Sequence, residues 1–204
     1  MITHSKIVSD WYKFVKFTNF KLRPKQRELA EAILRFPELS RVKWTRGSGK
    51  SHLLGYLAFF LAYRFKWKIG VVAPKLAQTW SILEHSHRAC VQSKVKPVYD
   101  NRYEIILPGG GVIKGLSGNK TAFTQGFHAH LLFIDESHDI ELDVVTESFY
   151  PMLANYAGRM ILSGVGGEPG SPIEAMEFDY QSIYPWTEYI DYFPRYQKTV
   201  DKER

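Results

Sequence analysis

The chain has 204 residues, 45% of them hydrophobic and 24% charged, with a formal net charge of +6. This balance is ordinary for a globular protein, and the length suits one α/β domain with a substantial core. No run of about 18 apolar residues is present, so we expect neither a transmembrane helix nor a membrane partner. The single cysteine, Cys90, excludes an internal disulfide and favours a reducing cytoplasm; we expect it to be buried in a helix. The basic excess is compatible with a polyanionic partner without demanding one.

Two helices are expected before the first strand. Residues 5–18 place Trp11 and other apolar residues at helical spacing between lysines. Such a face usually packs on its own domain, although it could instead contact nucleic acid or a neighbouring subunit. Residues 22–27 open the next helix with Pro24 in its first turn. Gln26 lies in that turn, and its amide can donate and accept at once, which suits the edge of adenine. The alternative is a solvent-facing helix glutamine.

A phosphate cradle is predicted between a strand at residues 41–44 and a helix at residues 50–64 that is apolar nearly all round. Gly47 and Gly49 allow the backbone to bend tightly and to approach a ligand closely. The amides of such a turn, together with the helix N-terminus, converge on an anion. The stretch reads Trp44, Thr45, Arg46, Gly47, Ser48, Gly49, Lys50 and Ser51.

The polar side chains of this stretch suit a nucleoside triphosphate. Lys50 supplies a point charge for the β- and γ-phosphates, and the Ser51 hydroxyl can ligate Mg²⁺. Arg46 can reach a γ-phosphate with its planar fork, or can be a surface arginine paired with an acid. Trp44 stands where the usual P-loop has its first glycine. Without its context, the Gly-Lys-Ser tripeptide could equally be a glycine-rich surface turn.

The second half of the nucleotide site is predicted at the end of an apolar run, residues 131–134. Such a run is typical of a buried parallel strand that delivers carboxylates at its carboxyl end. We expect Asp135 to hold Mg²⁺ through water, together with Ser51. Glu136 should point away from Asp135, because successive strand residues face opposite sides of the sheet, and it is the candidate for polarising the attacking water. A helix-cap or salt-bridge role for Glu136 is the alternative. A zinc site built from residues 135–138 and the nearby histidines matches no common ligand set.

The remaining chain completes an alternating α/β pattern. We expect strands at residues 69–74 and 159–164, helices ending near residues 91 and 155, and a β-hairpin formed by residues 103–107 and 112–116. The loop at residues 73–75 should share a sheet edge with the phosphate cradle. Residues 117–130 are expected to form an exposed loop. We therefore predict a P-loop core over residues 1–170, including the N-terminal helical segment, and a small lid or linker region over residues 171–204.

These segments resemble the ATPase domain of the large terminase subunit of tailed phages, the viral DNA-packaging motor. Residues 46–51 resemble its Walker A form, in which an arginine lies inside the loop and the first glycine is often missing. Residues 131–136 resemble its Walker B strand with the catalytic glutamate. Residues 22–26, which end at Gln26, resemble its adenine-binding Q motif. Residues 72–75 resemble a post-strand motif shared with helicases. Ser163 sits where the family has its coupling motif, which links hydrolysis to movement.

The resemblance, over roughly residues 20–170, implies a three-layer RecA/ASCE-like fold and a Mg²⁺-dependent ATPase that moves double-stranded viral DNA into a procapsid. It also implies the portal protein and the small terminase subunit as partners, and a homo-oligomeric ring docked on the procapsid in the host cytoplasm; a monomer in isolation is compatible with it. One departure is Gln125-Gly126, where many members have Arg-Gly, the arginine that acts across subunits. Another is the family's C-terminal nuclease, which we do not expect here because the sequence ends at Arg204.

Two other functions share the same nucleotide chemistry. The chain could be one RecA-like half of a DNA helicase or translocase, which would need a second half. It could also be a nucleotide-gated interaction module in which Glu136 is a structural acid. DNA contacts are expected from Lys75, residues 94–96 and the loop at residues 117–130, without a motif that selects among them.

Overall fold

A single mixed sheet organises the molecule. In the computed structural model, which describes residues 3–119, 126–185 and 188, eight strands lie in the order β3-β4-β5-β2-β6-β7-β1-β8. The strands are β1 (Leu39–Trp44), β2 (Lys68–Ala73), β3 (Tyr99–Asn101), β4 (Glu104–Ile106), β5 (Val112–Ser117), β6 (Leu131–Ile134), β7 (Arg159–Gly164) and β8 (Tyr180–Tyr184). Pairing is parallel from β5 to β8 and antiparallel among β3, β4 and β5. The predicted mostly parallel sheet and its hairpin, β4–β5, are confirmed.

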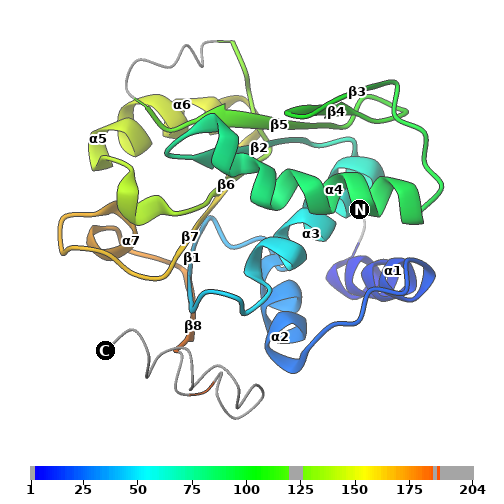
Figure 1. Ribbon diagram of the computed structural model, residues 1–204, viewed down its shortest axis with the longest axis horizontal. Coiled ribbons are helices and arrows are strands. Elements are labelled where there is room, and N and C mark those ends of the chain that lie inside the picture. Colours follow the sequence, from blue (N-terminus) through cyan, green and yellow to red (C-terminus); the bar gives the residue numbers. More distant parts are fainter. Residues whose placement is uncertain (1–2, 120–125, 186–187, 189–204) are drawn as a thin grey trace.

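Helices cover both faces of this sheet, which gives the expected three layers (Figure 1). The main helices are α1 (His4–Phe17), α2 (Pro24–Ile33), α3 (Lys50–Phe65) and α4 (Trp80–Gln92), followed by the short α5 (Leu142–Val144), α6 (Tyr150–Leu153) and α7 (Pro172–Ala175). Val71, Phe133 and Ile161 belong to the core shared with α1 to α4. Their strand neighbours Val72, Ile134 and Leu162 belong to the core shared with α5 and α6. This alternation follows from the two-residue period of a strand.

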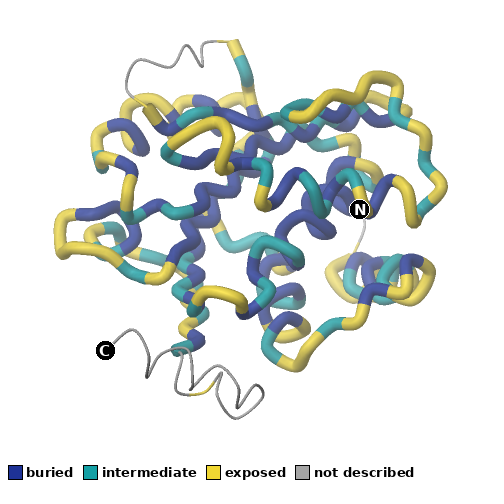
Figure 2. The backbone as a smooth tube through the Cα atoms, viewed as in Figure 1, coloured by how far each residue is buried: buried dark blue, intermediate teal, exposed yellow. Residues whose placement is uncertain are grey.

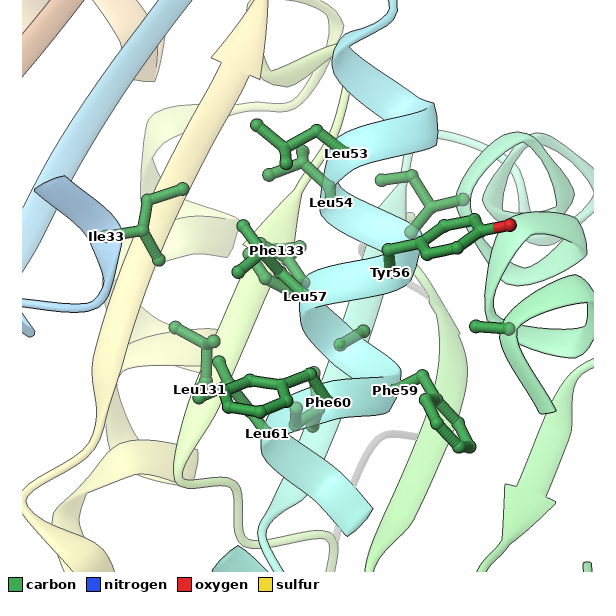
Figure 3. Packing of buried hydrophobic residues seen from close by; sticks show 14 of the residues in the cluster. Ile33, Leu53, Leu54, Tyr56, Leu57, Phe59, Phe60, Leu61, Leu131 and Phe133 are labelled. Carbon is green, nitrogen blue, oxygen red and sulfur yellow. The ribbon is translucent and has the colours of Figure 1, made fainter. Parts of the chain in front are cut away.

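The helix α3 lies at the centre of the larger core (Figure 3). Every residue from 53 to 62 is buried, as expected for a helix that is apolar nearly all round. Gly49 is its N-cap with φ +87°, and Lys66 ends it in the left-handed conformation. The helix therefore begins directly at the phosphate loop, and its burial fixes the position of that loop relative to the sheet.

The first helix packs on its own domain, which answers the question left open for residues 5–18. Trp11 is fully buried, with its ring 5.3 Å from Phe60 in an edge-on arrangement. Arg64 of α3 pairs with Asp10 of α1 at 3.1 Å. An apolar face and an ion pair thus hold α1 against α3, and the helix has both buried and exposed residues along its length (Figure 2).

The helix expected near residues 144–155 is divided into short pieces. A π-helical turn over Val145–Phe149 lies between α5 and α6, and a 3₁₀ turn over Ala154–Tyr156 follows. Pro151 lies at the start of α6, and proline lacks the backbone N–H that a continuous helix needs from it. The chain still buries Val144, Phe149 and Met152 against the sheet.

The segment assigned to a lid or linker contributes a strand to the core sheet. β8 pairs in parallel with β1, and Asp179 accepts a hydrogen bond at 2.9 Å from the backbone N–H of Leu39. The predicted lid or linker region also includes residues 186–187 and 189–204, which lie outside the described residues. No helix within the described ranges is long and apolar enough to cross a bilayer.

Candidate nucleotide site

The strand order brings three separate sequence segments to one edge of the sheet. β7 lies between β1 and β6, and the phosphate loop follows β1 while Asp135 and Glu136 follow β6. Adjacent strands are about 4.8 Å apart, so the ends of β1 and β6 are about 10 Å apart. A lysine side chain can cover most of that distance. Ser163, near the end of β7, is placed between the two halves of the site.

The phosphate loop has the backbone that its glycines predicted. Gly47 and Gly49 have φ of +73° and +87°, in the left-handed region that glycine adopts without cost. The loop borders a cavity of about 260 Å³ that is lined by Trp44, Thr45, Arg46, Gly47, Ser48, Gly49, Lys50, Ser51, His52, His85, Glu136 and Val165. Arg46 is exposed at this cavity, and Ser51 is partly buried in its wall.

Two residues that precede α3 in sequence brace the loop from behind. Gln26 is buried, accepts a hydrogen bond from the backbone N–H of Arg23 at 3.0 Å, and donates to the Gly49 carbonyl at 2.8 Å. Arg23 donates to the Ser48 carbonyl at 3.1 Å. A Cβ at Gly49 would lie 2.6 Å from the Gln26 amide nitrogen, so no larger residue fits there. The solvent-facing alternative for Gln26 is therefore wrong, and its adenine contact remains a prediction.

A buried ion pair joins the two halves of the site. Lys50 Nζ lies 2.6 Å from Asp135 Oδ1, and both side chains are more than nine-tenths buried. The same carboxylate accepts hydrogen bonds from Ser163 Oγ at 2.7 Å and from Ser81 Oγ at 3.3 Å. Burying a carboxylate is costly unless it is paired and hydrogen-bonded, and these three donors meet that requirement. Lys50, Asp135 and Ser163, which the sequence placed in three different motifs, thus form one cluster.

Glu136 has an unusual backbone and a histidine partner. Its φ is +49°, which is uncommon for a residue with a side chain and is a form of local strain found at functional sites. His138 Nε2 lies 3.5 Å from Glu136 Oε2. His138 is itself packed against the end of β7, where a Cβ at Gly164 would come within 2.8 Å of its Nδ1. Glu136 borders the cavity, and the contact with His138 links it to the end of β7.

Two stacked histidines form the wall of the cavity beside Ser51. The rings of His52 and His85 are 4.3 Å apart and inclined by 26°. Burial lowers the pKa of His52 to about 4, and the neighbouring charges of His85, Arg88 and Arg23 act in the same direction. Burial also lowers the pKa of His85. Both rings are therefore neutral near pH 7, so this wall adds a flat and uncharged surface.

Trp44 occupies the position of the missing first glycine without blocking the loop. Its side chain is 1% exposed, and its Nε1 donates to Ser182 Oγ of β8 at 2.9 Å. The ring packs edge-on against Tyr184 at 5.5 Å. A tryptophan is tolerated here because β8 supplies both an apolar neighbour and a hydrogen-bond acceptor for its indole.

The structure adds several supporting residues that were not predicted from the sequence. No motif includes Ser81, His52 or His85. Arg23 lies in the stretch that resembles the Q motif but had no predicted role, and His138 was considered only as a metal ligand. Gln125 lies outside the described residues, so its departure from Arg-Gly is untested.

His130 precedes β6, at the opposite edge of the sheet from Asp135. Within the described ranges, no group of three or more His, Cys, Asp or Glu could hold a metal ion. Cys90 is buried in α4, and burial raises the pKa of its thiol to about 12.

The residues present fit a magnesium nucleotide. Ser48 Oγ is buried and has no hydrogen-bond partner among the described residues, which leaves a donor in the phosphate loop. A serine hydroxyl at Ser51 and a carboxylate at Asp135 are oxygen ligands of the kind that Mg²⁺ prefers. Glycines in the left-handed conformation at the start of a long helix are the usual setting for a bound phosphate.

Comparison with solved structures assigns the fold. The ATPase domain of the large terminase of Thermus phage P74-26 matches with a TM-score of 0.68 at 19% identity, over 91% of this chain and 90% of that chain. The large terminase of bacteriophage HK97 matches with a TM-score of 0.64 at 12% identity, over 91% of this chain and 44% of that one. The large terminase of a further, thermophilic bacteriophage gives a TM-score of 0.52 at 12% identity, over 78% and 37% of the two chains.

The chain thus has the P-loop ATPase fold seen in phage large terminases. The family model described as RNA cytidine acetyltransferase NAT10/TcmA, helicase domain, matches residues 42–164, which is more than half of the chain. The chain therefore belongs to this helicase-domain family, and the match extends from within β1, through the phosphate loop, to the end of β7. No curated protein sequence matches the chain.

Proposed function

We propose that this chain is a Mg²⁺-dependent ATPase that converts ATP hydrolysis into movement of double-stranded DNA, as the packaging motor of a tailed phage. The observation that supports the proposal best is the buried contact between Lys50 of the phosphate loop and Asp135 at the end of β6. Each residue comes from a different half of the predicted nucleotide site. The likeness to terminase ATPase domains supports the packaging role.

In the proposed mechanism, the loop amides and Lys50 bind the β- and γ-phosphates. Lys50 leaves Asp135 for the phosphates when ATP enters, and Ser163 and Ser81 keep the Asp135 carboxylate hydrogen-bonded. Ser51 and Asp135 would hold Mg²⁺, which supplies charge neutralisation. Arg46, exposed at the cavity, reaches the γ-phosphate with its guanidinium. Gln26 contributes the adenine contact with the N–H that its bond to Gly49 leaves available.

Glu136 is the proposed general base. Its carboxylate borders the cavity and is held by His138 at 3.5 Å in this structure. In the ATP-bound state it orients the attacking water and accepts its proton. Ser163 is the proposed coupling residue, because its hydroxyl contacts Asp135 and its carbonyl accepts a hydrogen bond from Ser137 at 3.2 Å. A change at the nucleotide would thereby reach β7 and the loop that follows it.

The assembly proposed for this function is a ring of identical subunits on a procapsid in the host cytoplasm. The portal protein and a small terminase subunit are the proposed partners, and double-stranded DNA is the moved substrate. Lys75, which is exposed after β2, lies on the same sheet edge as the phosphate loop and is the described residue we assign to DNA contact first. The domain division at residue 170 also stays a proposal.

Steady-state ATP turnover tests the site. Lys50→Ala is expected to abolish nucleotide binding, whereas Glu136→Ala should retain ATP and lose turnover by about 10²- to 10⁴-fold. Exposed residues provide matched controls, Lys16→Ala and Glu177→Ala, which should behave as wild type. Unimpaired turnover in both site variants would remove the assignment. A structural role for Glu136, as in a nucleotide-gated module, predicts equal and low turnover with and without the substitution.

The helicase alternative is favoured by the matching helicase-domain family. Turnover measured with double-stranded DNA, single-stranded DNA and single-stranded RNA separates the two functions. A packaging motor predicts stimulation by the duplex. A helicase half predicts stimulation by a single strand, and strand separation when a second RecA-like half is supplied.

A further inference from the structure

A second cavity opens where the strands begin, at the end of the sheet opposite to the phosphate loop. It has a volume of about 210 Å³ and is lined by Phe36, Trp67, His130, Tyr156, Ala157 and Arg159. These residues precede or begin β1, β2, β6 and β7, whereas the phosphate loop, Asp135 and Ser163 lie where β1, β6 and β7 end. The strands between the two edges have four to six residues, so the cavities are about 13–20 Å apart. This cavity has no part in the proposed hydrolysis.

Aromatic rings form most of its wall. The rings of Tyr156 and His130 are 3.8 Å apart and inclined by 15°, and His130 lies 5.7 Å from Trp67 at 14°. Phe36 lies 5.1 Å from Trp67. His130 is fixed in this stack because its Nδ1 accepts a hydrogen bond from the backbone N–H of Lys68 at 3.1 Å. Tyr156 remains 41% exposed, so this platform of rings is open to solvent.

The backbone around the cavity is held in an uncommon conformation. Phe36 and Ala157 have φ of +58° and +44°, and left-handed backbone costs a residue with a side chain about 1–2 kcal/mol. Arg159 Nε donates to the Phe36 carbonyl at 3.1 Å, and the same guanidinium donates to the Ala157 carbonyl. Arg159 thus donates hydrogen bonds to both of these residues, and all three line the cavity. Strain that is retained and braced in this way is a recurrent property of binding sites.

Charge and size restrict the ligand. Arg35 is exposed beside Phe36, and Arg159 is in the wall of the cavity. Burial lowers the pKa of His130, and the nearby charge of Lys68 lowers it further. Glu38 lines an adjoining cavity that shares Ala157 and Arg159, and it is not among the residues that line this one. These basic side chains disfavour a cationic ligand on the platform of rings. The volume is below the roughly 300–1,000 Å³ of drug-sized pockets, so it suits one planar ring.

We propose that this cavity binds one unstacked base of a single-stranded nucleic acid, with the strand's phosphates along the basic side chains beside it. Sequence-tolerant stacking of bases on aromatic rings beside basic side chains is the common mode of single-strand binding. A free mononucleotide fits this cavity less well, because its phosphates would contact long side chains in place of the backbone amides of a phosphate loop. The proposal does not depend on ATP hydrolysis by the other edge.

Binding of a fluorescein-labelled oligothymidylate to the full chain tests the proposal by anisotropy, without ATP. Quenching of tryptophan fluorescence, in which Trp67 takes part, provides a second signal. Tyr156→Ala should weaken binding about 5- to 100-fold, because a base–aromatic stack is lost. Tyr156→Phe should restore it, and Tyr99→Ala, a tyrosine of similar exposure on β3, should have no effect. Lys16→Ala, at an exposed residue of α1, should bind the strand as wild type does. Strand binding is measured without ATP, so a failure of the ATPase assignment stays distinguishable.

Several outcomes would overturn the proposal. One is an oligothymidylate affinity that is unmeasurable in wild type or unchanged in Tyr156→Ala, with the variant's fold verified by its unfolding curve. Thymidine monophosphate that competes as strongly as the strand would show a mononucleotide site instead. A change of oligomeric state in Tyr156→Ala, with unchanged strand binding, would show that the platform of rings receives another copy of the chain.

Discussion

At the scale of single residues, the pair formed by Lys50 and Asp135 dominates the energetics of the nucleotide site. Both side chains are almost fully buried, and the carboxylate has two further hydroxyl donors. A buried pair adds little net stability over an apolar replacement, because desolvation offsets the attraction. Removing one partner is much more costly, since the other charge remains buried and unpaired. The pair therefore holds Lys50 in place in this structure, and in the proposed mechanism phosphate replaces the carboxylate.

This argument predicts the outcome of a double-mutant cycle measured by urea unfolding. Asp135→Leu should destabilise the fold by about 3–5 kcal/mol because Lys50 stays buried without its partner, whereas the double variant Lys50→Met with Asp135→Leu should recover a large part of that loss. Glu84→Ala, which breaks an exposed pair with Arg88, is the control and should cost less than about 1 kcal/mol. A double variant as unstable as the sum of its singles would contradict the account.

At the scale of elements, the contact between α3 and α4 sets the width of the site. Gly55 lies in this contact, where a Cβ would come within 2.5 Å of both the Ile82 carbonyl and the His85 side chain. Ser86 Oγ donates to the Gly55 carbonyl at 2.9 Å, which ties the helices together at the same point. The glycine is needed for close approach and not for its φ, since α3 is regular there.

Gly55→Ala should therefore destabilise the protein by about 1–3 kcal/mol, because backbone atoms of α4 cannot rotate away. Alanine favours a helix over glycine by about 1 kcal/mol, so a simple propensity argument predicts the opposite sign. Gly170→Ala, with nothing within 4 Å of the added methyl group, is the control. Urea midpoints at constant slope decide between the two signs.

The same helix contact makes stability depend on pH. The pKa of His52 is about 4 in the fold against 6.5 when unfolded, mainly because burial disfavours the imidazolium. The unfolded chain therefore binds a proton that the folded chain refuses between these values, and His52's contribution to stability is lost as pH falls through that window. The slope from His52 approaches about 1.4 kcal/mol per pH unit. The free energy of unfolding, measured with urea from pH 7 downward, should fall less steeply with decreasing pH in His52→Phe than in the wild type. An identical pH dependence would refute the lowered pKa of His52.

At the scale of the whole molecule, the sequence was sufficient for the class of fold, and it located the two segments that the structure brings together at the candidate site. Gly47, Gly49 and Lys50 lie at a strand-to-helix junction, and Asp135 follows an apolar strand; both are local patterns with a direct physical reason. The contacts made by Arg23, Ser81 and His138 depend on which helices and loops meet in space. No local period in the sequence encodes those contacts.

The strands at the sheet edges also escaped prediction. Tyr99–Asn101 is short and exposed, so β3 lacks the apolar alternation that indicates a strand. In β8 the alternation exists, with Tyr184 buried and Ile183 exposed, but the surrounding aromatic-rich composition favoured a lid. The position of β7 between β1 and β6 likewise depends on the global pairing. That position puts Ser163 in contact with Asp135, which the sequence alone could only suggest by resemblance.

The central claim is that one triphosphate is gripped at this edge of the sheet by residues from β1, β6 and β7. A crystal structure with Mg²⁺ and a non-hydrolysable ATP analogue tests it most directly. The account predicts the phosphates within the loop at residues 44–51, Lys50 moved from Asp135 to the phosphates, and Glu136 facing the γ-phosphate. An analogue bound elsewhere, or Lys50 still paired with Asp135 beside an occupied loop, would contradict it.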